Sequence, residues 1–209
     1  MVQKESKRRG RPRTHDPEAA LLAAAGVFWT RGLAGTSLDD LAAAMGMNRP
    51  SIYLAFGDKD ALYRKALDHF RQHLAAALAE LDRSPDLHRG LLAFFDQAID
   101  VYTDGDQAKG CMVMCTAPAV ALTHPEVRED LASIIHRADT ALLRRIERAM
   151  QAGELPAGIS AKGLAMTLQA ILHSLALRSR AGEPARALRR FAREAVALCM
   201  GRAPPAGKL

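Results

Sequence analysis

Apolar residues recur at intervals of three and four along most of this 209-residue chain, which is the spacing of an amphipathic α-helix. No stretch alternates apolar and polar residues in the manner of a β-strand, and aromatic residues make up only 5% of the sequence. The pattern predicts an all-α protein of about nine helices. They are expected over residues 17–31, 38–45, 50–56, 59–81, 86–103, 111–122, 125–152, 161–180 and 185–200.

Two short helices near the N-terminus are separated by only a few residues. Thr36 or Ser37 caps the first, which ends at Gly46, and Asn48 caps the second, which tolerates Pro50 in its first turn. Two short helices joined by a glycine-containing turn form a helix-turn-helix, in which the second helix enters the major groove of DNA. The sequence therefore predicts a DNA-binding element.

The predicted recognition helix has one inward position and several outward ones. Ile52 is the expected inward anchor, because Ile52 and Phe56 share a helix face. Arg49 is expected to contact guanine or phosphate, with a solvated surface charge as the alternative, and Asn48 either contacts adenine or serves only as a cap. Ser51 and Tyr53 are expected phosphate ligands; the alternatives are a surface position for Ser51 and packing against the first helix for Tyr53.

Lys59 stands in the first turn of the following helix, where its charge opposes the helix dipole. A nearby phosphate would explain this placement, and a solvated lysine beside Tyr63 is the alternative.

The segment T-S-L-D-D-L-A-A-A-M-G-M-N-R-P-S-I-Y-L-A-F-G-D-K-D-A-L resembles the DNA-binding domain of the TetR family of repressors, and the match extends over about residues 16–65. The resemblance implies a phosphate contact from the hydroxyl of Thr36 or Ser37. It also implies DNA-binding roles for the Y-x-x-F pattern, here Tyr53 and Phe56, and for Lys59 in the K-x-x-L that follows. Two departures are Pro50-Ser51, where Gly-Thr or Gly-Ser is frequent, and Leu54, where many members have histidine.

The same resemblance divides the chain into an arm at 1–15, the DNA-binding domain at 16–65, an effector-binding and dimerisation domain at 66–201, and a tail at 202–209. Arm and tail are expected to be disordered. Family members are homodimers whose last two helices pair into a four-helix bundle, so a palindromic double-stranded DNA operator and release by a small-molecule or thiol-reactive effector are implied. The candidate interface residues, which could equally be monomer core, are Leu168, Ile171, Leu172, Leu175, Phe191, Val196 and Leu198.

The positive charge is concentrated in the arm. The net charge is +6, and residues 1–13 contain six basic residues and one acidic residue, so the remainder carries only +1. The segment K-R-R-G-R-P-R resembles an AT-hook, in which residues such as Arg11 and Arg13 enter a narrow minor groove. DNA contact is favoured over a solubilising tail.

Effector-binding candidates come from the apolar helices beyond residue 66. Phe94, Phe95, Tyr102, Met112 and Met114 could line a cavity or form ordinary core. Polar candidates, each with a purely structural alternative, are Thr116, His136, Gln169 and His173.

Three cysteines, an odd number, do not suggest a secreted disulfide framework, so free thiols are expected. Cys111 lies at a predicted helix start, and both the helix N-terminus and the nearby Lys109 would lower the pKa of its thiol. Cys115 follows four residues later and shares the same helix face. The surrounding G-C segment is similar to one in TetR-like regulators that sense electrophiles or oxidants. A buried inert thiol is the alternative.

Other classes receive less support. Cys111, Cys115 and His124 lack a second ligand pair for a metal, and no cofactor motif is present. Cys111 with His124 or His136 lacks a recognisable oxyanion loop, so no enzyme is predicted. The sequence has no apolar run of membrane-spanning length and no signal peptide, which favours the cytoplasm. A nonspecific architectural DNA-binding protein is the remaining rival.

Overall fold

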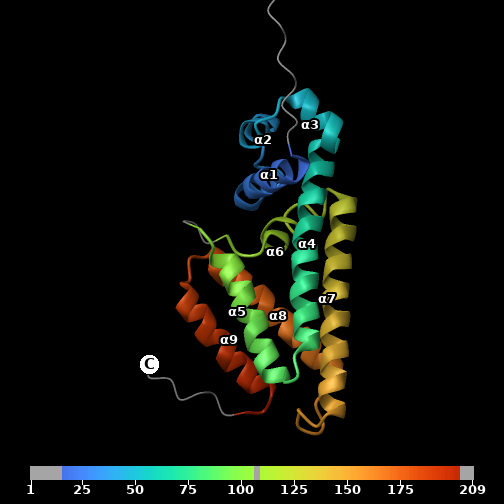
Figure 1. Ribbon diagram of the computed structural model, residues 1–209, viewed down its shortest axis with the longest axis vertical. Coiled ribbons are helices and arrows are strands. Elements are labelled where there is room, and N and C mark those ends of the chain that lie inside the picture. Colours follow the sequence, from blue (N-terminus) through green and yellow to red (C-terminus); the bar gives the residue numbers. More distant parts are fainter. Residues whose placement is uncertain (1–15, 106–108, 203–209) are drawn as a thin grey trace, which may run out of the picture.

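The computed structural model describes residues 16–105 and 109–202, and within them it contains nine helices and no strand (Figure 1). This confirms the all-α prediction. The helices are α1 (Pro17–Arg31), α2 (Leu38–Met45), α3 (Arg49–Phe56), α4 (Lys59–Arg83), α5 (Leu87–Thr103), α6 (Met112–Thr116), α7 (Pro125–Gln151), α8 (Ala161–Arg180) and α9 (Ala185–Cys199).

Most helix starts lie where the capping residues predicted them. Ser37, rather than Thr36, caps α2 through a capping box with Asp40. The largest difference is α6, which has five residues instead of filling the apolar run at 111–122. Pro118 follows its C-cap, and a proline cannot donate the backbone hydrogen bond that would extend the helix.

Two apolar clusters stabilise the described structure. One joins α1–α3 and the first half of α4 to α6 and the start of α7, and includes Phe28, Ile52, Tyr63 and Met112. The other joins the second half of α4 to α5, α7, α8 and α9. Helix α4 passes through both clusters and lies beside α7 (Figure 1). The expected domain boundary after residue 65 therefore falls inside one continuous helix.

Most of the interface candidates are core of the single chain, which was the alternative. Leu168, Leu172, Leu175 and Val196 are buried because they face the other helices of the second cluster. Ile171 is also in that cluster and Phe191 is half-buried against it, whereas Leu198 is exposed. Among the described residues, no helix is both long enough and apolar enough to cross a membrane.

Candidate DNA interface and effector cavity

Helices α2 and α3 form the predicted helix-turn-helix. Gly46 ends α2 in the left-handed conformation with φ of 63°, and Asn48 caps α3 by accepting a 2.8 Å hydrogen bond from the Ser51 backbone N–H. Ile52 is fully buried, as predicted, and fixes the inner face of α3. Figure 1 shows α3 at the end of the molecule opposite the C-terminal helices.

The outer face of α3 combines a cation, a phenol and an aliphatic side chain. Arg49 and Asn48 are exposed, Ser51 is half-buried, and Tyr53 is 49% exposed, so about half of its side chain is available for contact. Leu54 is 91% exposed. It lies about 200° around the helix from Ile52, so it is the side chain directed furthest outward. In the sequence, Leu54 is distinguished only as a departure from the family pattern.

Arg49 is held by an acidic side chain of the neighbouring helix. Its Nε and Nη2 donate hydrogen bonds of 2.9 and 2.5 Å to the two carboxylate oxygens of Asp39, near the start of α2. The hydrogen bonds and charge of Asp39 raise the pKa of Arg49, and Arg49 in turn lowers the pKa of Asp39. Both side chains are exposed, so the pair contributes little to folding stability.

Three predicted DNA contacts have interior roles instead. Thr36 is 2% exposed and its hydroxyl donates to the Gly32 carbonyl at 2.6 Å, so it cannot serve as a surface phosphate ligand. Phe56 is 7% exposed because it packs in the first apolar cluster. Lys59 Nζ donates to the carbonyls of Leu33 and Thr36, each at 3.0 Å. These carbonyls explain the lysine at a helix start without a phosphate.

Ser37 is exposed and remains a candidate, although its hydroxyl already takes part in the capping box with Asp40. Ser37 and Asp39 stand at the start of α2, and Asn48 and Arg49 at the start of α3. Arg11 and Arg13 lie outside the described residues.

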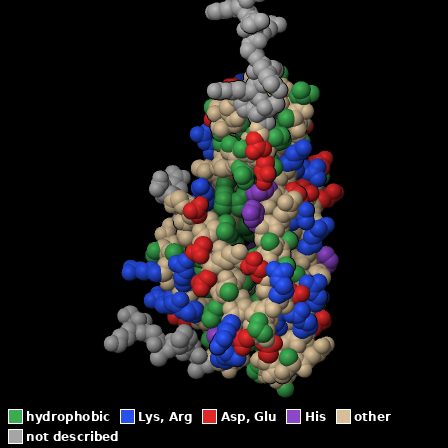
Figure 2. Space-filling view, viewed as in Figure 1, with side chains coloured by type: hydrophobic (Ala, Val, Ile, Leu, Met, Phe, Trp, Pro, Cys, Tyr) green, Lys and Arg blue, Asp and Glu red, His purple; other side chains and the backbone are tan. Residues whose placement is uncertain are grey.

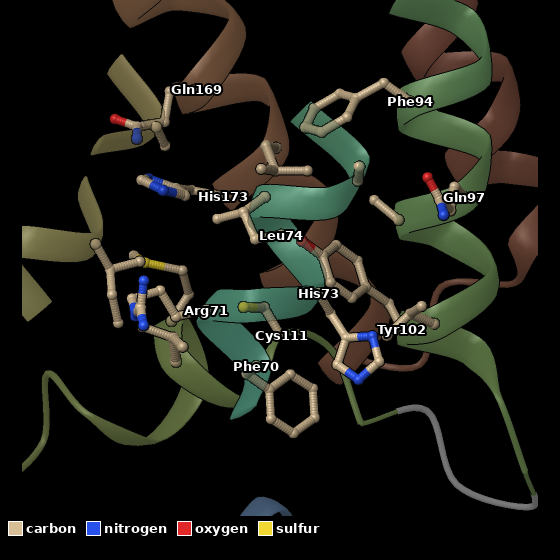
Figure 3. A pocket seen from close by; sticks show the side chains of 18 of the residues that line it. Phe70, Arg71, His73, Leu74, Phe94, Gln97, Tyr102, Cys111, Gln169 and His173 are labelled. Atoms are coloured by element: carbon tan, nitrogen blue, oxygen red, sulfur yellow. The ribbon is translucent and has the colours of Figure 1, made fainter. Parts of the chain in front are cut away.

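A cavity of about 160 Å³ lies between α4, α5, α6, α7 and α8 (Figure 3). Six of the predicted effector-binding residues line it, namely Phe94, Tyr102, Cys111, Met114, Gln169 and His173. Helix α4 contributes Phe70, Arg71, His73 and Leu74, which the sequence analysis did not select. Phe70 and Leu74 belong to the apolar stripe of that helix, and this stripe was the available signal. On the face shown in Figure 2, apolar side chains line a hollow beside histidines.

Five predicted effector-binding residues lie elsewhere, and one of them, Met112, is fully buried in the first apolar cluster. Phe95 is fully buried in the second apolar cluster, and His136 is exposed on α7. The Thr116 hydroxyl is buried 2.7 Å from the Tyr63 hydroxyl, and Cys115 Sγ faces the Ala176 carbonyl at 3.9 Å. Their side chains are directed away from the cavity or occupied by other contacts.

The polar groups around the cavity already have protein partners. Gln169 Nε2 donates to the Ile135 carbonyl at 3.0 Å, and Arg71 forms a 2.6 Å ion pair with Asp68. His73 Nε2 lies 3.0 Å from His69 Nε2. Burial lowers the pKa of His173, and the charge of Asp139 only partly opposes this, so the neutral imidazole is favoured. The cavity is therefore mainly apolar and offers no unpaired charge among these groups.

Cys111 does not have the lowered pKa that its position suggested. It is the N-cap of α6, and backbone hydrogen bonds from Met114 and Val113 favour the thiolate, but burial outweighs them and raises the pKa. Lys109 lies 5.5 Å above the Trp29 ring. The expectation of a resting thiolate is therefore wrong. Within the described part of the chain, no three histidine, cysteine or acidic side chains come together as candidate metal ligands.

The chain matches two family profiles, described as "Bacterial regulatory proteins, tetR family" over residues 20–66 and "Tetracyclin repressor-like, C-terminal domain" over residues 87–195. It is 28% identical to the transcriptional repressor ComR of Escherichia coli (strain K12) over 178 residues, 84% of this chain and 85% of ComR. It is 29% identical to the repressor BdcR of the same strain over 149 residues, 71% of this chain and 74% of BdcR.

Solved structures show the same arrangement. A cysteine mutant of the TetR family transcriptional regulator CifR, complexed with 26-bp double-strand operator DNA, matches with a TM-score of 0.78 at 30% identity over 89% of this chain and 98% of that chain. A TetR family regulator from Cytophaga hutchinsonii matches with a TM-score of 0.76 at 25% identity over 92% and 96%. The chain with this helix-turn-helix and cavity belongs to the TetR family of transcriptional regulators, which bind DNA and are not enzymes.

Proposed function

We propose that this protein is a repressor that binds a palindromic operator as a homodimer and leaves it when a small effector enters the cavity beside α4. The continuity of α4 carries this proposal. Leu62, Tyr63 and Leu67 of α4 belong to the apolar cluster of the DNA-binding helices, while Phe70 and Leu74 of the same helix line the cavity. A ligand that displaces the second part of α4 therefore also moves the helices that contact DNA.

The proposed DNA-contacting surface consists of the outer face of α3 and the exposed start of α2. Its members are Ser37, Asn48, Arg49, Ser51, Tyr53 and Leu54, together with Arg11 and Arg13 of the N-terminal arm. Leu54 offers an apolar contact of the kind that recognises a thymine methyl group in the major groove. Cationic residues of the arm would add phosphate contacts and salt dependence.

Dimerisation is assigned to the outer faces of α8 and α9. Met166 and Leu177 are each 55% exposed on α8, and Leu198 is 72% exposed on α9. Phe191 of α9 is half-buried, and the Arg178 guanidinium of α8 lies 4.9 Å from its ring, so the two faces adjoin. A two-fold pair built on this surface would present two α3 helices about 34–36 Å apart, the repeat of one turn of DNA.

The cavity indicates the chemical class of the effector. An engineered apolar cavity of about 150 Å³ holds benzene, and this one measures about 160 Å³. An uncharged molecule of one or two rings, or an aliphatic molecule of similar volume, fits a cavity of this size. An uncharged ligand is favoured because Arg71 is already paired with Asp68 and Gln169 already donates to the Ile135 carbonyl. Cys111 borders the same space, so an electrophilic member of this class could react with it once bound.

The test is selection of genomic fragments by the purified full-length protein, followed by a comparison of affinities. A repressor should prefer its operator over random DNA by about 10³-fold or more at physiological salt. Equal affinity for both would support a nonspecific architectural protein and contradict the proposal. Deletion of residues 1–15 should weaken binding to either DNA and reduce its dependence on salt, because phosphate contacts are lost.

A further inference from the structure

The Arg49 guanidinium is fixed on one edge and free on another. Its side-on edge, Nε and Nη2, is occupied by the two oxygens of Asp39 at 2.9 and 2.5 Å. Within the described residues, Nη1 has no hydrogen-bond partner. A guanidinium has five N–H groups in one plane, so Nη1 and the second N–H of Nη2 still form an end-on pair of donors. That pair has the geometry required to contact O6 and N7 of guanine together.

Asp39 also belongs to a different helix from Arg49. Arg49 is the first residue of α3, and Asp39 is in the first turn of α2. The two hydrogen bonds therefore orient the exposed arginine side chain across the turn of the helix-turn-helix. An arginine held in one orientation before binding loses less conformational entropy when it contacts a base.

We infer that Asp39 is a positioning residue for operator specificity, which orients Arg49 so that its end-on edge contacts one guanine in each half-site. This inference rests on the proposed function. Asp39 makes two opposite contributions to DNA binding. Its negative charge lowers affinity for every sequence because it repels phosphates, while its hold on Arg49 increases discrimination for guanine.

The experiment uses the full-length protein and the operator recovered by genomic selection. Each guanine is replaced in turn by 7-deazaguanine, which removes the N7 acceptor and keeps Watson–Crick pairing. The wild-type protein should lose about 10- to 100-fold in affinity at one guanine per half-site, the range expected when one hydrogen bond from a charged donor is lost while O6 remains. Asp39→Asn should reduce that loss to less than about threefold while affinity for random DNA increases, because a negative charge has been removed.

Two further variants separate positioning from folding and from general charge effects. Arg49→Lys keeps the positive charge and can still donate to guanine, but it lacks the planar fork that Asp39 holds through Nε and Nη2. In this background Asp39→Asn should therefore leave the 7-deazaguanine loss unchanged. Glu18→Gln removes one negative charge from the first turn of α1 without touching Arg49. It should raise general affinity slightly and leave the 7-deazaguanine loss unchanged.

The outcomes are distinct. An unchanged or larger 7-deazaguanine loss in Asp39→Asn would overturn the inference, because Asp39 would then be either irrelevant to Arg49 or restraining it from DNA. A wild-type protein that tolerates 7-deazaguanine at every position would also overturn it, although operator binding itself would stand. Failure to recover any preferred operator would contradict the proposed function and not merely the role of Asp39.

Discussion

The hydroxyl groups of Tyr63 and Thr116 lie 2.7 Å apart in a buried contact that joins α4 to α6. Thr116 donates its own proton to the Met112 carbonyl at 2.7 Å, so Tyr63 is the donor to Thr116. The contact connects Tyr63 of the first apolar cluster to the short helix α6, whose N-cap is Cys111. It is therefore one of the links between the cavity wall and the DNA-binding helices.

Tyr63→Phe should lower the free energy of unfolding by about 1 kcal/mol, the usual contribution of one hydrogen bond. Thr116→Val should lower the free energy of unfolding by about 1–3 kcal/mol, because the hydrogen bond to the Met112 carbonyl is lost and the buried Tyr63 hydroxyl is left without an acceptor. Urea denaturation of both single variants and the double variant measures the coupling. Strictly additive effects would show that the two hydroxyls do not stabilise one another.

The contribution of Tyr63 to folding stability should depend on pH. Burial raises the pKa of Tyr63 to about 12, with the Thr116 hydrogen bond opposing the shift. Since the neutral phenol is favoured in the folded state, its stabilising contribution is complete below pH 10 and declines as the pH rises toward 12. The stability difference between the wild type and Tyr63→Phe should therefore narrow over that interval.

The self-association of the protein is expected to depend on the exposed apolar faces of α8 and α9. Leu177→Glu and Leu198→Glu each place a charge on that surface and should produce monomers at micromolar concentration, with operator affinity falling at least tenfold since one half-site is lost. Leu122→Glu is the matched control, because Leu122 is 91% exposed but lies in the segment after α6. Sedimentation velocity measures the association state. Monomeric wild type, or dimeric Leu177→Glu and Leu198→Glu, would exclude this face as the interface.

The sequence pattern predicted helix positions and caps well, because periodicity and capping are local properties. It also identified Ile52 as the anchor of α3. Thr36 and Phe56, which it assigned to the DNA surface, are buried, and Lys59 is half-buried with intramolecular partners, because such contacts are decided by the packing of segments distant in sequence. Lys59 illustrates this: its acceptors, the carbonyls of Leu33 and Thr36, are 26 and 23 residues away.

The pKa of Cys111 could not be predicted from its place at a helix start either. The local effect of backbone N–H groups was correctly recognised, but the larger effect on the pKa is burial, which only the tertiary structure supplies. Gly110, just before it, has φ of +66°, and an added Cβ would lie 2.4 Å from the Ala176 carbonyl oxygen. The close approach of α8 explains why this position is glycine.

The raised pKa of Cys111 predicts slow alkylation of the resting protein. Its thiolate fraction at pH 7.5 should be smaller than that of a thiol with the ordinary pKa of 9.0, so iodoacetamide should modify it more slowly than free cysteine. The rate should increase continuously as the pH rises above 9. Mass spectrometry of the modified peptide gives the rate, with Cys111→Ser identifying the site. Alkylation faster than free cysteine at pH 7.5 would indicate an activated thiolate and contradict this environment.

Leu54 should recognise the methyl group of one thymine in each half-site. Replacing that thymine by deoxyuridine removes only the C5-methyl, and the wild-type protein should lose about 0.8 kcal/mol per half-site, or about fourfold in affinity. Leu54→Ala should bind the two DNAs equally, because the apolar partner is already missing, whereas the control Leu122→Ala should retain the wild-type difference. Fluorescence anisotropy with operators substituted at one thymine at a time gives the required affinities. If the methyl penalty persists in Leu54→Ala, another side chain makes the contact, and the exposure of Leu54 has a different explanation.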